Sequence, residues 1–243
     1  VTEADLRALF EDQIQWREVC RWSSRHRRVE ARQQEMLGAL VLDDRIWRDP
    51  PDELIVAATL EGLRELGIAT LSWSGKAKRL RSRITLVGLE RDGWPDCSDA
   101  GLEARLEAWL GPHMGGIRTA AALGKFDPYD ALLGQLDWPM RQILDREAPA
   151  SYQTPAGRQA PINYDGETPD AEVRLQEMLG LDRHPTVAGQ ALRRPDQTTM
   201  DLPGFWRSSS ADVRRDMRGR YPKHPWPEDP IAAQPTLRAK PRA

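Results

Sequence analysis

Proline limits most tightly what this chain can fold into, because six of its nineteen prolines lie between Pro222 and Pro241. Each proline fixes its own φ and lacks a backbone N–H, so helices and central strands cannot pass through this segment. Prolines at this density favour polyproline II or open coil. We therefore expect an extended Pro-rich strap over residues 219–230 and a disordered basic tail over residues 231–243.

Upstream of the strap, apolar spacing predicts regular structure. A polar turn at residues 23–27 separates two β-like stretches, which predicts a hairpin. The continuous apolar run at residues 37–42 fits a buried strand or the end of a helix. An apolar stripe that begins after Asp52 and stops at Gly67 predicts a helix. Ser74 is expected to cap the next helix.

These patterns predict an α+β, helix-rich fold. Residues 1–48 form a small β-containing region with the hairpin, and about five helices between residues 49 and 148 form a helical bundle. Residues 149–230 are expected to be a mixed α/β domain with short strands that ends in the strap. Residues 201–206 within it are expected to be an irregular aromatic segment. The chain does not begin with Met, so we expect it to be a piece of a longer protein.

Composition excludes several classes of protein. Lysine and arginine total 35 against 37 acidic residues, so nucleic acid could bind only through local patches. Cys20 and Cys97 are isolated, which argues for a reducing, cytoplasmic setting and against a disulfide scaffold. The four histidines are far apart and predict no metal site. No apolar run is long enough to cross a membrane.

The sequence lacks the residues that nucleotide chemistry needs. The Gly-Lys pairs are at Gly75-Lys76 and Gly124-Lys125, and neither has the spaced glycine and the following Ser or Thr of a P-loop. No nucleophile elbow and no carboxylate pair with a catalytic spacing is present. We expect no catalytic residue and no cofactor in this chain.

Cationic clusters provide the positive signals for binding, because dense cations bind phosphate through counterion release. A solvated helix face paired with nearby acids is the alternative for each cluster. The hairpin carries Arg21, Arg25, Arg27, Arg28 and Arg32. The two clusters that we assign to RNA contact as a hypothesis consist of Lys76, Lys78, Arg79, Arg81 and Arg83, and of Arg214, Arg215, Arg218, Arg220 and Lys223.

The segment GRYPKHPWPEDP at residues 219–230 combines prolines, cations and aromatic residues. Core packing does not require such a string. We expect Tyr221, His224 and Trp226 to anchor the strap in a groove on this chain or on a neighbouring domain.

This segment resembles the near-terminal part of HrpB-type bacterial ATP-dependent RNA helicases of the DEAH-box group. The resemblance extends over almost the whole chain, since further strings follow the order in that family. They are LGALVL at 37–42, LSWS at 71–74, WPD at 94–96, RLQEMLG at 174–180 and DLPGFW at 201–206. After Gly189 the sequence departs from the family, which predicts a missing or shortened strand.

The resemblance implies a non-catalytic C-terminal accessory region. Its partners would be RNA and the upstream RecA-like motor domains, which would hold ATP and Mg²⁺, and the protein would be a cytoplasmic monomer. The region would contact the RNA backbone, brace the motor, or do both. The alternative is a protein-interaction module that docks a partner through the strap.

Overall fold

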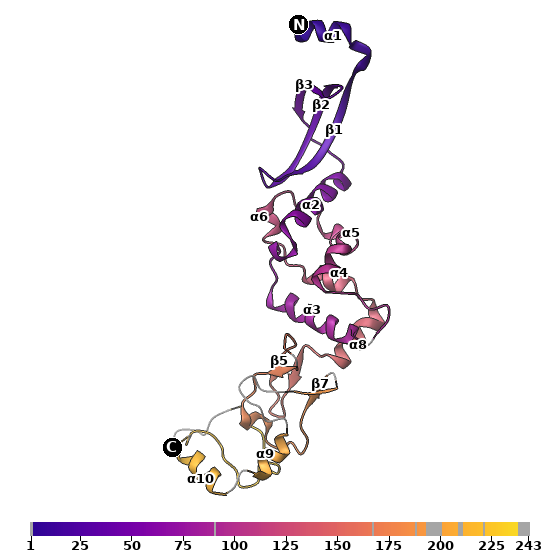
Figure 1. The fold of residues 1–243 in the computed structure, drawn as a ribbon. Coiled ribbons are helices and arrows are strands. Elements are labelled where there is room, and N and C mark those ends of the chain that lie inside the picture. Colours follow the sequence, from indigo (N-terminus) through magenta and orange to yellow (C-terminus); the bar gives the residue numbers. More distant parts are fainter. Residues whose placement is uncertain are drawn as a thin grey trace. The chain divides into compact units, whose positions relative to one another are not determined.

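The computed structural model describes residues 2–89, 91–166, 168–187, 189–192, 201–208, 211–220 and 222–237. Helices and small antiparallel sheets make it α+β, as expected (Figure 1). The chain forms two compact units, and each unit uses two separate stretches of sequence. Unit 1 contains residues 1–77 and 97–135, and unit 2 contains residues 78–96 and 136–243. The boundaries expected from composition, after residues 48, 148 and 230, stay a prediction.

Unit 1 begins with α1 (Glu3–Leu9), the 3-10 turn η1 (Glu11–Gln13) and an antiparallel sheet. The sheet has the order β1 (Ile14–Ser23), β2 (Arg28–Leu37) and β3 (Leu40–Ile46). The expected hairpin is therefore present, and its strands are longer than the sequence pattern indicated. Trp22 pairs with Val29 next to the turn.

The expectation of one buried element at residues 37–42 is wrong. Gly38, at a φ of +59°, turns the chain between β2 and β3 and splits the apolar run. Leu40 and Val41 are 57% and 50% exposed on the strand at the sheet edge. A continuous apolar run was therefore not sufficient to predict burial of this segment.

The sheet of unit 1 is anchored on α2 (Asp52–Leu66), the helix predicted from the apolar stripe. Gly67 ends α2 at a φ of +78°, and its N–H donates to the Leu63 carbonyl. Trp22 is buried against the Gly62 backbone, where a side chain would overlap the indole ring. The helices that complete unit 1 are short: η2 (Ile68–Thr70), the start of α3 (Gly75–Gly88), α4 (Asp99–Ala104), α5 (Leu106–Trp109), η3 (Gly111–His113), α6 (Ala120–Leu123) and α7 (Tyr129–Gly134).

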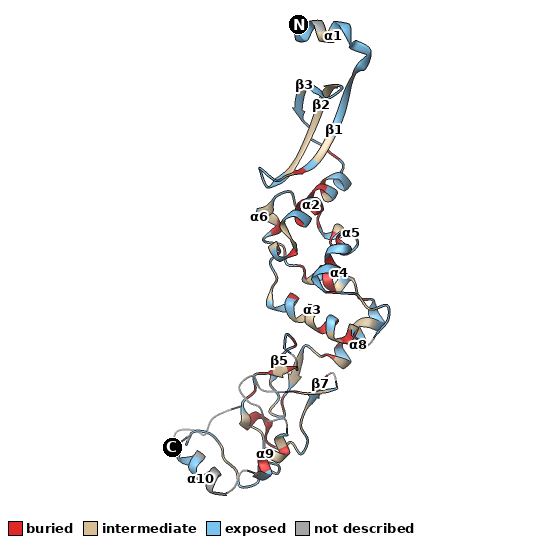
Figure 2. Ribbon diagram, in the orientation of Figure 1, coloured by how far each residue is buried: buried red, intermediate tan, exposed pale blue. Residues whose placement is uncertain are grey.

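The core of unit 1 lies among these helices rather than on the sheet (Figure 2). Its fully buried side chains come from α2, α4, α5, α6 and α7, from Leu110 at the end of α5 and from the loop at Met114. They include Ile55, Leu60, Leu63, Leu102, Leu106, Leu110, Met114, Leu123 and Leu132.

Unit 2 combines helices with small sheets. The larger part of α3 and α8 (Trp138–Glu147) precede the three-stranded sheet of β4 (Ser151–Gln153), β5 (Gln159–Asn163) and β6 (Asp170–Ala171). The 3-10 turn η4 (Leu175–Met178), the strand pair β7 (Thr186–Val187) and β8 (Gln190–Ala191), and the helices α9 (Leu202–Ser208) and α10 (Ala211–Arg220) follow. Alternate residues Ala160 and Ile162 on β5 are buried.

The expectation of an irregular segment at residues 201–206 is wrong, because α9 occupies it. Pro203 lies in the first turn, where a helix tolerates proline. The backbone N–H of Leu202 donates to His184 Nδ1 over 3.1 Å, and Trp206 buries its ring. The stretch after Gly189, where a missing or shortened strand was expected, begins with the two-residue strand β8, and residues 193–200 lie outside the described residues.

We predict that Gly62→Ala destabilises unit 1, because the new Cβ would lie 2.2 Å from the Trp22 ring. The overlap should cost about 1–3 kcal/mol, more than the roughly 1 kcal/mol that alanine gains over glycine in a helix. Urea unfolding measures the change. Gly134→Ala is the control, since its nearest contact would be His113 at an ordinary 3.9 Å. Equal stability of the two variants would contradict the packing of Trp22 on α2.

Candidate functional site

Helix α3 carries the first cationic cluster on a firmly packed scaffold. Ser74 caps the helix as expected, because its Oγ accepts from the Ala77 N–H over 3.1 Å. One side of α3 is buried through side chains at helical spacing. These are Ala77, Leu80, Ile84 and Val87.

Three cations of α3 remain available on its surface. Lys76 and Lys78 are exposed and Arg79 is half-buried. None of them has an ion pair with a described carboxylate, and α3 itself contains no acidic residue. Lys76 and Lys78 lie in the first turns of the helix, where a positive charge opposes the helix dipole. Helix stability therefore does not explain their placement. Arg81 is half-buried and has interactions of its own.

Arg83 differs from the rest of its cluster, because its side chain is only 8% exposed. Its Nη2 lies 2.6 Å from an Asp145 oxygen of α8, and its Nε donates to the carbonyl of Ala148. These bonds tie α3 to the end of α8. The structure thus gives Arg83 a structural role, and we leave it out of the RNA contact.

The C-terminal cluster is more strongly paired. Arg220 pairs with Asp216 at 3.0 Å, and both Nε and Nη2 of Arg218 donate to the Trp226 carbonyl at 3.0 and 2.8 Å. Lys223 and Arg215 are exposed, and Arg215 has interactions of its own. The Arg214 side chain and Tyr221 lie outside the described residues. Among the described members of this cluster, the side chains of Arg218 and Arg220 are therefore already engaged within the chain.

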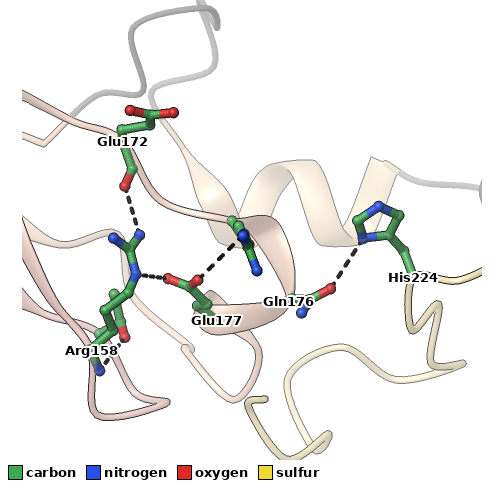
Figure 3. A network of polar contacts seen from close by, with 7 residues as sticks. Arg158, Glu172, Gln176, Glu177 and His224 are labelled. Atoms are coloured by element: carbon green, nitrogen blue, oxygen red, sulfur yellow. Dashed lines mark hydrogen bonds and ion pairs between the residues drawn. The ribbon is translucent and has the colours of Figure 1, made fainter. Parts of the chain in front are cut away.

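A buried carboxylate that sequence reasoning missed lies in η4. Glu177 is 1% exposed, and its Oε2 accepts from Arg158 Nε over 2.8 Å. Arg158 also donates to the Glu172 carbonyl over 2.7 Å (Figure 3). Arg174 Nε approaches Glu177 at 4.0 Å from the solvent side. Because an unpaired buried carboxylate is costly, this pair fixes the 158 loop against η4.

The Pro-rich segment is attached to the same turn. His224 Nδ1 lies 3.1 Å from Gln176 Oε1, as Figure 3 shows, so the expected anchor His224 contacts the body of unit 2. The Gly180 N–H donates to the Pro230 carbonyl, and the Thr236 N–H donates to the Gln176 carbonyl. Residues 222–237 contain turns and no helix or strand. Trp226 is half-buried.

Ionisation in unit 2 follows from burial and pairing. Burial raises the pKa of the Tyr164 hydroxyl, which donates to the Pro149 carbonyl over 2.7 Å. Hydrogen bonds from Arg91 and then Arg146 lower the pKa of Glu147. Among the described residues, no three His, Cys, Asp or Glu side chains converge as metal ligands would. No described helix is long and apolar enough to span a membrane.

Comparison with known proteins identifies the family. A family model described as "ATP-dependent helicase C-terminal", HrpB_C, matches residues 109–230. The chain belongs to the HrpB family of ATP-dependent helicases. The ATP-dependent RNA helicase HrpB of Escherichia coli K12 is 36% identical over 240 residues, which cover 93% of this chain and 30% of that protein.

Solved structures agree with this assignment. The crystal structure of the E. coli DExH-box NTPase HrpB is 35% identical, with a TM-score of 0.70 over 97% of this chain and 31% of that chain. A second structure, described as the E. coli DEAH/RHA helicase HrpB, has a TM-score of 0.64, is 36% identical and covers 88% of this chain and 29% of its own. The chain thus spans less than a third of the HrpB proteins it matches.

We predict that Arg158→Ala destabilises unit 2, because the buried Glu177 carboxylate would be left without its nearest cationic partner. Breaking a buried pair costs about 3–5 kcal/mol. Thermal or urea unfolding checks the loss. Arg174→Ala is the matched control, since its side chain is 68% exposed and 4.0 Å from the carboxylate. A surface pair of this kind contributes at most about 1 kcal/mol. Equal effects of the two variants would show that the pair of Arg158 and Glu177 does not anchor η4.

Proposed function

We propose that this chain is a non-catalytic C-terminal accessory region of an ATP-dependent RNA helicase and that it contacts the RNA backbone through α3. The parent protein would hold ATP and Mg²⁺ in RecA-like domains upstream, and those domains would be the second partner of this region. We further propose a cytoplasmic monomer. Family membership supports this assignment, because the E. coli relative is described as an ATP-dependent RNA helicase.

The observation that carries RNA contact is the uncompensated charge at the start of α3. Lys76, Lys78 and Arg79 lie within four residues, without an acidic residue in the helix and without an ion pair to a described carboxylate. The N–H groups at a helix start favour anions, and the lysines add full positive charges. Such a surface can bind the phosphate groups of an RNA of any base sequence, so we expect binding without base specificity.

The packing of α3 supports the same role. The buried side chains of Leu80, Ile84 and Val87 and the bonds of Arg83 fix the unit 2 part of α3, so Lys78 and Arg79 project from a firmly packed segment. Rigid placement lowers the entropy that is lost when a ligand binds. Bracing of the motor is the second role, and it does not exclude the first.

The test of RNA contact is the salt dependence of binding to a labelled single-stranded RNA. We expect the triple variant Lys76→Gln, Lys78→Gln, Arg79→Gln to bind more weakly. The binding constant K falls as salt rises, and each phosphate contact on a single strand contributes about −0.7 to the slope of log K against log salt. In the variant this slope should become less negative by about 2, for three lost contacts. Fluorescence anisotropy at several salt concentrations measures the slope.

The matched control removes three exposed cations elsewhere, at Arg17, Arg48 and Arg174. It should keep the wild-type slope within about 0.7, one phosphate contact. If the α3 variant kept the wild-type slope as well, α3 would not contact RNA. Weakened association with the upstream motor in that variant would then assign the helix to bracing.

Partner docking through the strap at residues 219–230 makes a different prediction from attachment to unit 2. The bonds from Gln176 and Gly180 lead us to expect that deletion of residues 222–243 lowers the melting temperature of the chain. Deletion of residues 238–243 alone is the control and should leave it unchanged. A fully stable 222–243 deletion that had lost a protein partner would instead support docking.

A further inference from the structure

The turn between β1 and β2 carries cations that the proposed α3 contact does not use. Residues 24–27 form this turn, and Arg25, Arg27 and Arg28 are exposed there. Arg27 has a φ of +52°, a left-handed conformation that glycine or asparagine adopts more readily than arginine. No hydrogen bond or ion pair of its side chain with described residues accounts for an arginine at this position.

The fold brings a further cation to this turn from a distant part of unit 1. The Val29 N–H donates to the Arg118 carbonyl over 2.8 Å, and the Ala120 N–H donates to the Arg27 carbonyl over 3.0 Å. An isolated antiparallel bridge joins Arg28 to Thr119. The turn therefore lies beside the start of α6 (Figure 1), and Arg118, whose side chain is exposed, is linked to it through its backbone. We call Arg25, Arg27 and Arg118 the tip arginines.

Acidic residues near the turn are occupied by other groups. Glu30 accepts from His26 Nδ1 at 2.7 Å and lies 3.9 Å from Arg28. Glu65 accepts from Ser24 Oγ, and Glu61 from the Trp22 N–H. None of the tip arginines has an ion pair within 4 Å of a described carboxylate, and all of them are exposed. Burial raises the pKa of the nearby Cys20 thiol, and the positive charge of Arg118 partly opposes that shift.

The chemistry of the tip arginines selects the ligand. Guanidinium groups are planar, stay charged and bind phosphate oxygens through paired hydrogen bonds. Exposed guanidinium groups on two backbone-linked segments suit a chain of phosphates better than a single buried anion. The backbone bonds at Arg27, Val29 and Arg118 hold the segments together without using these side chains.

We propose that the tip arginines form a second, separate phosphate contact on unit 1 for the RNA strand that this region binds. The proposal rests on the proposed function, because RNA is its ligand. This contact is independent of the α3 contact, because none of its residues lies on α3. It also explains why an arginine occupies position 27, where the left-handed backbone would favour glycine.

The test uses the double variant Arg27→Gly, Arg118→Gln in the whole 243-residue chain. Glycine tolerates the left-handed backbone, so the variant removes two charges without straining the turn. The probe is a labelled single-stranded RNA, measured by anisotropy across salt concentrations. We expect the slope of log K against log salt to become less negative by about 1.4, for two lost phosphate contacts. Arg27→Lys, Arg118→Lys should keep the wild-type slope, because it keeps both charges.

The matched control is Arg17→Gln, Arg48→Gln, which removes two exposed cations of unit 1 away from the turn. It should leave the slope unchanged. A wild-type slope in the tip variant together with a reduced slope in the α3 variant would overturn the tip contact and leave the proposed function standing. Absence of RNA binding by the unmodified chain at low salt would overturn both. Equal loss in the tip variant and its control would show only nonspecific attraction and would also overturn the tip contact.

Discussion

A carboxylate withdrawn from water must keep a partner, and in unit 2 this requirement organises much of the fold. Glu177 is buried in a single 3-10 turn, and Arg158 reaches it from the loop between β4 and β5. The neighbouring Gln176 receives His224 and Thr236 from the end of the described chain. Strands of two to five residues cannot hold such a domain by themselves. Polar bonds between distant segments supply the missing constraints.

The sequence predicted the elements whose signals are local. The apolar stripe before Gly67, the Ser74 cap and the polar turn of the hairpin each specify their own backbone, and each is present. The wrong expectations concern tertiary context. Residues 202–206 are helical because the side of the helix that carries Trp206 packs into the fold, and no residue within the segment reveals that packing site. The exposed Leu40 and Val41 likewise depend on what lies next to β3.

Candidate site residues show the same limit. The spacing of Lys76, Lys78, Arg79 and Arg83 identified a cationic helix, but it could not separate surface charges from one committed to Asp145. Arg118 carries no signal of its own, since its neighbours in sequence are not basic. It joins the β1–β2 turn through main-chain bonds that depend on the whole of unit 1. In a chain whose net charge is −2, position in the fold decides which cations remain uncompensated.

The way the two units share the sequence has a consequence for biosynthesis. Unit 1 needs residues 97–135, and unit 2 needs residues 78–96 together with everything after residue 135. A chain that leaves the ribosome from its N-terminus must therefore release residue 135 before unit 1 can close. Until the later residues of unit 2 are synthesised, the apolar face of α3, which carries Leu80 and Ile84, remains exposed to solvent. Nascent chains stalled after α3 is complete but before the later part of unit 2 follows would expose that face, which makes this interval the one where a chaperone is most useful.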